Sequence, residues 1–164
     1  MSGERAYGFT LFCDDIRQEI GEKTTFVGTY LAKLIVHQPF PLTLPKFGIA
    51  LTYFEKVGTC SEKVRFRIFF PGDPPEKPAI EGDIPMDDLR GTPWTGPNID
   101  AKDYGPEGPN PLHRVDLRFL LAPVVLKQKG LIKVRIMLGD ELIRLGALEI
   151  DQQLPQSPKS PKSS

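Results

Sequence analysis

The chain has 164 residues, of which 40% are hydrophobic and 26% are charged, and its formal net charge is zero. This composition is typical of a globular protein with one domain of ordinary size, and it argues against a disordered chain. Zero net charge provides no overall field to gather nucleic acid or an anionic membrane surface, so we expect neither as a partner.

The N-terminal residues have neither the basic start nor the apolar stretch of a secretory signal peptide. No apolar run approaches the roughly twenty residues that a membrane-spanning helix needs. The two cysteines, Cys13 and Cys60, match no metal-binding or redox spacing. We therefore expect a cytoplasmic protein with reduced thiols.

The N-terminal part of the chain predicts two strands joined by a charged turn. Large residues at positions 7, 9, 11 and 13 alternate with smaller ones, and this period ends at Asp14 and Asp15. Residues 25–36 are rich in β-branched and aromatic residues and predict one long second strand. Between them, residues 14–21 fit a short turn of helix, because Asp14 can cap it and Ile16 and Ile20 are four positions apart.

The middle of the chain adds a connection and two further strands. Residues 37–45 contain three prolines and predict an extended connection between sheets, because proline cannot donate a hydrogen bond to a sheet ladder. Residues 47–53 predict a third strand. The strict alternation at residues 64–70 predicts a strand with one buried face and one solvated face, the latter carrying Arg65 and Arg67.

Residues 71–112 predict a long loop without regular structure. They hold ten of the seventeen prolines and six of the fifteen glycines, with no sustained period. Nine acidic residues stand against three basic ones, which gives this segment a net charge of 3 − 9 = −6 and leaves +6 on the rest of the chain. Neutrality of the whole protein therefore conceals a division of charge.

Strand patterns return at residues 114–121, 131–138 and 142–150, the last two joined by a tight turn. These segments predict an all-β protein, an antiparallel β-sandwich of two sheets and about seven to eight strands, immunoglobulin-like or C2-like, with a closed barrel as the alternative. We expect one domain at residues 1–152 and a disordered Ser/Pro/Lys-rich tail at residues 153–164.

Asp14, Asp15 and Glu19 form an acidic group at the end of the first strand. Carboxylate oxygens suit calcium, and further ligands could come from Asp87, Asp88, Asp100 and Asp103. The alternative is a turn in which an aspartate accepts backbone N–H groups and Arg17 or Lys23 balances the charge. No spacing resembles an EF-hand loop, so the turn is the favoured interpretation and we expect no cofactor.

Basic residues occupy the outward positions of several predicted strands: Arg65, Arg67, Arg114, Arg118, Lys133 and Arg135. If these strands are neighbours, the residues compose one basic sheet face on which the acidic segment 71–112 docks. The alternative is an ordinary solvated face whose charges contribute little individually. Trp94, inside the acidic segment, is either an exposed anchor for a partner or a contact that fixes the segment to the sheet.

No catalytic motif is present: the sequence has no Gly-x-Ser-x-Gly, no P-loop and no dinucleotide-binding glycine pattern. The leading hypothesis is therefore a non-enzymatic protein-binding or assembly module that uses the 71–112 segment or the basic face. The alternative is a calcium-dependent module or an enzyme with its site at Asp14, Asp15 and Glu19.

The N-terminal motif carries a resemblance. Residues 12–19 read Phe-Cys-Asp-Asp-Ile-Arg-Gln-Glu, and they are followed by Gly21, Lys-Thr-Thr at 23–25, Val-Gly-Thr-Tyr at 27–30 and the later pairs Phe-Pro at 40–41 and Leu-Pro at 44–45. This pattern resembles that of a family of small bacterial proteins of unknown function. The resemblance implies a bacterial origin and no particular reaction.

Overall fold

The structure, a computed structural model, describes residues 6–56, 63–84 and 112–154. These residues form twelve strands and no helix: β1 (Ala6–Cys13), β2 (Asp15–Gln18), β3 (Thr24–Val27), β4 (Lys33–Val36), β5 (Leu42–Leu44), β6 (Phe47–Lys56), β7 (Val64–Phe69), β8 (Ile80–Ile84), β9 (Leu112–Leu121), β10 (Val124–Leu126), β11 (Gly130–Leu138) and β12 (Glu141–Gln152). The all-β prediction is confirmed. The described residues therefore contain no helix that is long and apolar enough to cross a membrane.

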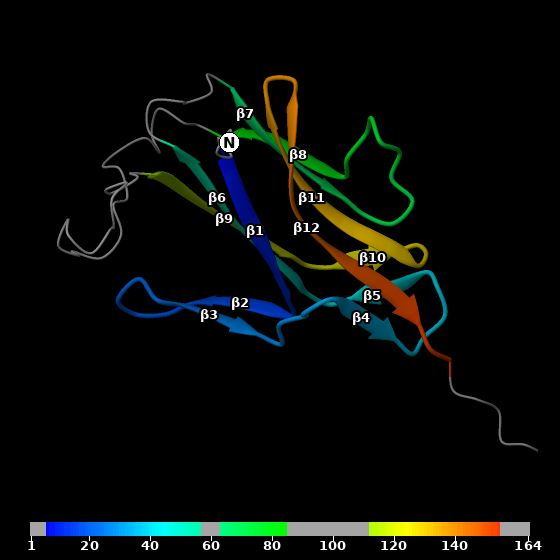
Figure 1. Cartoon of the computed structure of the whole chain (residues 1–164). Coiled ribbons are helices and arrows are strands. Elements are labelled where there is room, and N and C mark those ends of the chain that lie inside the picture. The colour runs from blue at the N-terminus through cyan, green and yellow to red at the C-terminus, as the bar shows by residue number, and fades with distance from the viewer. Residues whose placement is uncertain (1–5, 57–62, 85–111, 155–164) are drawn as a thin grey trace, which may run out of the picture.

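Two main sheets contain most of the strands (Figure 1). The three-stranded sheet has the order β1-β6-β9 and is antiparallel throughout. The five-stranded sheet has the order β4-β12-β11-β7-β8, in which only β4 and β12 run parallel. Two short antiparallel pairs, β2–β3 and β5–β10, complete the fold.

Both main sheets contribute buried side chains to one hydrophobic core. On β6, Phe47, Ile49 and Tyr53 are fully buried. From opposite sheets, the rings of Phe66 and Phe119 meet with their centroids 5.0 Å apart. The outer faces of the two sheets consequently point in opposite directions, and this separation decides where the charged residues lie.

The predicted helical turn at 14–21 and the predicted single strand at 25–36 are both wrong. Residues 15–18 form β2, which pairs with β3 in an antiparallel hairpin. The long segment is interrupted after Val27, because Gly28 adopts a φ of 64° and turns the chain before β4 begins at Lys33. The division of such segments explains why the strands outnumber the seven or eight expected.

The prediction that residues 71–112 lack regular structure is also wrong for the start of this segment, which contains β8. Asp73 organises the turn after β7, where its Oδ2 accepts hydrogen bonds from the backbone N–H groups of Phe70 (2.7 Å) and Ala79 (3.1 Å). The chain then returns as β8, which pairs with β7. Residues 85–111 of this segment, and residues 155–164 of the predicted tail, lie outside the described residues.

Candidate functional site

The N-terminal hairpin owes its position to Asp14. The backbone N–H of Asp14 donates to the carbonyl of Val27 at 2.9 Å, and its carboxylate accepts a hydrogen bond from the Tyr30 hydroxyl. Gly28 passes so close that an added Cβ would collide with the Asp14 carboxylate, and its φ of 64° independently favours glycine. Burial, reinforced by the Asp14 hydrogen bond, raises the pKa of Tyr30 well above its ordinary value, so the phenol stays protonated as a donor.

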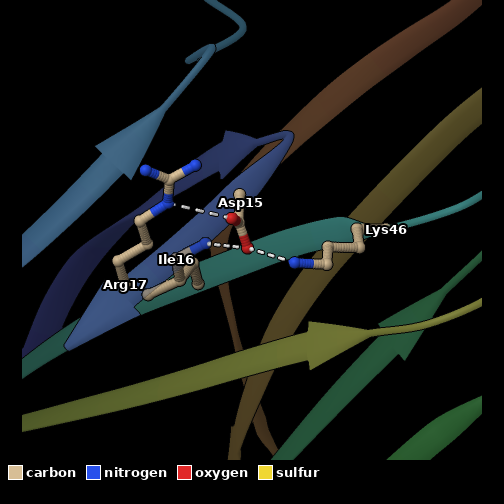
Figure 2. A network of polar contacts seen from close by, with 4 residues as sticks. All are labelled: Asp15, Ile16, Arg17 and Lys46. Atoms are coloured by element: carbon tan, nitrogen blue, oxygen red, sulfur yellow. Dashed lines mark hydrogen bonds and ion pairs between the residues drawn. The ribbon is translucent and has the colours of Figure 1, made fainter.

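Asp15 ties the hairpin to the three-stranded sheet (Figure 2). Its carboxylate accepts from Arg17 Nε at 3.2 Å and from Lys46 Nζ at 3.4 Å, and Lys46 immediately precedes β6. The same carboxylate accepts the backbone N–H of Ile16 at 3.1 Å. The hydrogen bond from Arg17 and the charge of Lys46 hold the pKa of Asp15 below its usual value.

These contacts support the turn interpretation of the acidic group. Asp14 and Asp15 are engaged with different partners, while Glu19 is exposed in the hairpin turn and its backbone N–H donates to the carbonyl of Lys23 at 2.8 Å. In the part of the chain that the structure describes, no group of three or more His, Cys, Asp or Glu side chains is placed to hold a metal ion. The additional ligands considered for calcium, Asp87, Asp88, Asp100 and Asp103, lie outside the described residues.

The hairpin lies against the outer face of the three-stranded sheet. An added Cβ on Gly48 would lie 2.6 Å from Cys13 Sγ and 2.8 Å from Ile16 Cγ1, so only glycine leaves room for this contact. Cys13 is fully buried there, and that burial raises the pKa of its thiol. Farther along the hairpin, Arg118 Nη1 on β9 donates to Gln18 Oε1 at 3.4 Å.

A groove of about 140 Å³ remains between the hairpin and the sheet. Its apolar side is formed by Phe9 and Leu11 of β1 and Phe26 of β3, and its polar side by charged residues of β9. Phe9 is 47% exposed and Leu11 is 37% exposed, and Tyr7 continues the same exposed row along β1. We call this feature the hairpin groove.

One positive charge in the hairpin groove has no carboxylate partner among the described residues. Asp116 accepts from Thr52 Oγ1 at 2.6 Å and from Arg114 Nε at 2.9 Å, so its charge is matched by Arg114. Arg114 also lies over the ring of Phe54, 5.9 Å from its centroid. Arg118 is exposed, and its only partner within the described ranges is the neutral Gln18 amide. The groove therefore combines an apolar wall with a cation that is available to a partner.

The predicted single basic face is wrong. Arg65, Arg67 and Arg135 belong to β7 and β11 of the five-stranded sheet, whereas Arg114 and Arg118 belong to β9 of the three-stranded sheet. The alternation along a strand correctly predicts that these side chains lie on the outer face of their sheet. The outer faces of the two sheets, however, point in opposite directions. The basic residues accordingly divide into two separate surfaces.

In the described part of segment 71–112, two carboxylates contact two of the predicted arginines. Asp83 of β8 pairs with Arg65 Nε at 2.7 Å, and Glu81 lies 3.3 Å from Arg67 Nε. The acidic segment thus reaches two of the predicted arginines, as an added strand rather than as a docked loop. Trp94 lies outside the described residues, and its two proposed roles stay predictions.

Sequence reasoning did not identify the hairpin groove. The alternation at residues 7–13 correctly indicated a strand, but its large side chains face solvent while the smaller Gly8 and Thr10 face the protein. They do so because β1 packs closely on β12: an added Cβ on Gly8 would lie 2.9 Å from Leu145 Cδ2. Small residues alternating with large ones were the available signal of this close approach.

Two larger hollows also lie among the described residues. One of about 550 Å³ lies between the start of β1 and residues 141–144, and one of about 270 Å³ lies beside β10. Volume alone would favour the first, whose lining brings together one carboxylate and one guanidinium beside an aromatic ring: Ala6, Tyr7, Gly8, Glu141, Leu142, Ile143 and Arg144. We favour the hairpin groove because Phe9, Leu11 and Phe26 give it a continuous apolar wall beside the guanidinium of Arg118.

Comparisons of the chain with protein-family models, with curated proteins and with solved structures found no match in any of the three.

Proposed function

We propose that this chain is a non-enzymatic protein-binding module and that its hairpin groove receives a peptide segment of a partner protein. The observation that carries the proposal is the exposed row Tyr7, Phe9 and Leu11 beside the available guanidinium of Arg118. Aromatic residues and arginine are the types enriched in protein interfaces and in their energetic hot spots.

The size of the groove supports a protein partner over a small substrate. Pockets for small molecules and cofactors usually measure about 300–1,000 Å³. The hairpin groove, at about 140 Å³, is smaller than this range and is continuous with the exposed row of β1. One side chain of a partner fills such a space while neighbouring residues cover the row.

The charges of the groove define the chemistry of the partner. Asp116 is already paired with Arg114, so within the described lining of the groove Arg118 is the group left to attract an opposite charge. We therefore propose that the partner segment carries an apolar side chain next to a carboxylate. The carboxylate would pair with Arg118, and the apolar side chain would contact Phe9, Leu11 and Phe26.

A peptide-display selection against the purified protein tests this proposal. The expected result is enrichment of peptides in which apolar and acidic residues are adjacent, with binding weakened at least tenfold by Arg118→Glu and by Phe9→Ser. Leu131→Ser is the matched control, because Leu131 is also 47% exposed but lies on β11 of the other sheet. Selected peptides without this composition, or equal losses in Leu131→Ser, would refute the proposed groove.

The broader expectations are proposals of the same kind. We propose that the two sheets sharing one core make a β-sandwich, immunoglobulin-like or C2-like in type, and that the chain belongs to the bacterial family suggested by residues 12–30. Neither proposal supplies a function, because one fold supports many unrelated activities. The functional proposal is argued from the groove alone.

A further inference from the structure

The outer face of the five-stranded sheet carries a row of three arginines. In the ladder, Arg135 of β11 lies opposite Arg67 of β7 on one side and opposite Arg144 of β12 on the other. Neighbouring strands are about 4.8 Å apart, so these side chains start within about 10 Å of one another. Like charges directly opposite one another in a sheet are destabilising, so a row of this kind requires an explanation.

The carboxylates on this face do not neutralise the row. Among the described residues, Glu81 of β8 is the only acidic residue that extends it, opposite Arg67, which leaves a formal charge of 3 − 1 = +2. In the adjacent row Asp83 is engaged by both Nε and Nη2 of Arg65, and on the other side Lys133 adds a further positive charge above the ring of Phe69.

The described residues supply few hydrogen-bond acceptors to the three arginines. Arg67 Nε is buried and lies 3.3 Å from Glu81 Oε2, but among the described residues it makes no hydrogen bond. Arg144 is exposed and has no ion pair or hydrogen bond with any described residue. A guanidinium has five N–H donors, and an arrangement that leaves so many without acceptors suits a ligand rich in acceptor oxygens.

Arg135 is the fixed centre of the row. Its Nη1 donates to the carbonyls of Val134 (2.8 Å) and Gly146 (3.1 Å), where the register of β11 and β12 shifts at a bulge. These two bonds hold the guanidinium against the sheet, and its Nε and Nη2 donors remain without acceptors in the described ranges. Burial, together with the neighbouring charge of Arg144, lowers the pKa of Arg135 from its ordinary value, although the group remains cationic.

From this geometry we infer that Arg67, Arg135 and Arg144 form a binding site for a phosphomonoester dianion. The ligand's two negative charges match the +2 of the row, and its three terminal oxygens accept hydrogen bonds from three guanidinium groups. The site lies on the opposite face from the hairpin groove and does not depend on the function proposed for it. The phosphomonoester has two possible sources, a free small molecule or a phosphorylated side chain of another protein.

The test is a titration of the full chain with inorganic phosphate at constant ionic strength, followed by the NMR signals of the arginine Nε–H groups. We expect saturable shifts for the three arginines of the row that chloride does not produce. Arg144→Gln should weaken phosphate binding at least tenfold, and Arg144→Lys should only partly restore it, because lysine keeps the charge but loses the planar fork.

Lys23→Gln is the matched control, since it removes one positive charge from an exposed position on the hairpin turn. The hairpin packs against the three-stranded sheet, whereas the arginine row lies on the five-stranded sheet. Equal losses in Lys23→Gln and Arg144→Gln, or shifts that do not saturate, would refute a built site. A parallel titration with a phosphoserine peptide distinguishes the two sources. Binding at least tenfold tighter than that of phosphate assigns the ligand to a partner protein, and equal binding assigns it to a free anion.

Discussion

Replacing Gly28 by alanine tests the account of the N-terminal hairpin most directly. The backbone φ of 64° costs about 1–2 kcal/mol for a residue with a side chain. In addition, the new Cβ would lie only 2.8 Å from Asp14 Cγ, so the carboxylate must move and its hydrogen bond with Tyr30 is lost, at about 1–2 kcal/mol. We therefore expect Gly28→Ala to lower the free energy of unfolding by about 2–4 kcal/mol.

Gly21→Ala separates the two contributions. Gly21 also has a positive φ, 76°, but an added Cβ there would meet nothing within 4 Å, so only the backbone cost of about 1–2 kcal/mol applies. The assay is urea unfolding followed by far-UV circular dichroism, with hydrogen exchange of the Tyr30 amide, which donates to Phe12 at 2.8 Å, as a local measure.

A double-mutant cycle between Asp14 and Gly28 tests whether the close approach of the two residues explains the glycine. In an Asp14→Ala background the obstructing carboxylate is gone, so Gly28→Ala should cost about as much as Gly21→Ala does in the unmodified protein. If Gly28→Ala costs the same with and without the Asp14 carboxylate, the close approach of the two residues does not explain the glycine. The same conclusion follows if the two glycine substitutions are equally costly in the unmodified chain.

Three further predictions concern titration and accessibility in the same region. The pKa of Asp15 is lowered in the fold by Arg17 and Lys46, so its carboxylate stabilises the fold above the unfolded pKa of about 4, and this stabilisation is lost as the pH falls further. Below about pH 4, the urea midpoint of Asp15→Asn should therefore depend less on pH than that of the unmodified protein. The pKa of Tyr30 is raised in the fold, so its protonated hydroxyl stabilises the fold below the unfolded pKa of about 10, and this stabilisation is lost as the pH rises above it. The urea midpoint of Tyr30→Phe should therefore fall less at alkaline pH than that of the unmodified protein. Cys13 is fully buried, so mass spectrometry should find its peptide unlabelled by a maleimide in the native protein and labelled in urea, and rapid native labelling would contradict the proposed packing.

Local patterns predicted most of the strands but not which sheet each one joins. The alternation around Arg65 and around Arg114 correctly indicated strands whose arginines face away from the core. Membership of a sheet depends on pairing between residues far apart in sequence, such as Arg114 of β9 with Phe54 of β6, and no local pattern encodes that choice. The predicted single basic face failed for this reason.

The hairpin was misread because its decisive contacts are tertiary. Residues 25–36 have the composition of one strand, and the interruption depends on a glycine that lies under the side chain of Asp14. The sequence predicts Asp14 as a turn residue, but the hydroxyl that donates to its carboxylate belongs to Tyr30, sixteen positions away. The hairpin groove depends on this arrangement, since Phe26 reaches it only when residues 24–27 pair with β2 instead of continuing into β4.

The arginine row shows how a single irregularity in register can create a surface feature. From Gly130 to Val134 the partners on β12 run from Ile150 back to Gly146, and at Arg135 the partner is Arg144 rather than Leu145. An unbroken ladder would place Leu145 outside, opposite Arg135, and would turn Arg144 toward the core, where an unpaired charge is costly. The bulge instead buries Leu145, exposes Arg144 beside Arg135, and leaves the Gly146 carbonyl to accept from Arg135 Nη1. The register shift that repairs the hydrophobic pattern of β12 is therefore the same one that assembles the proposed anion site, and the site could not be predicted without knowing where the bulge lies.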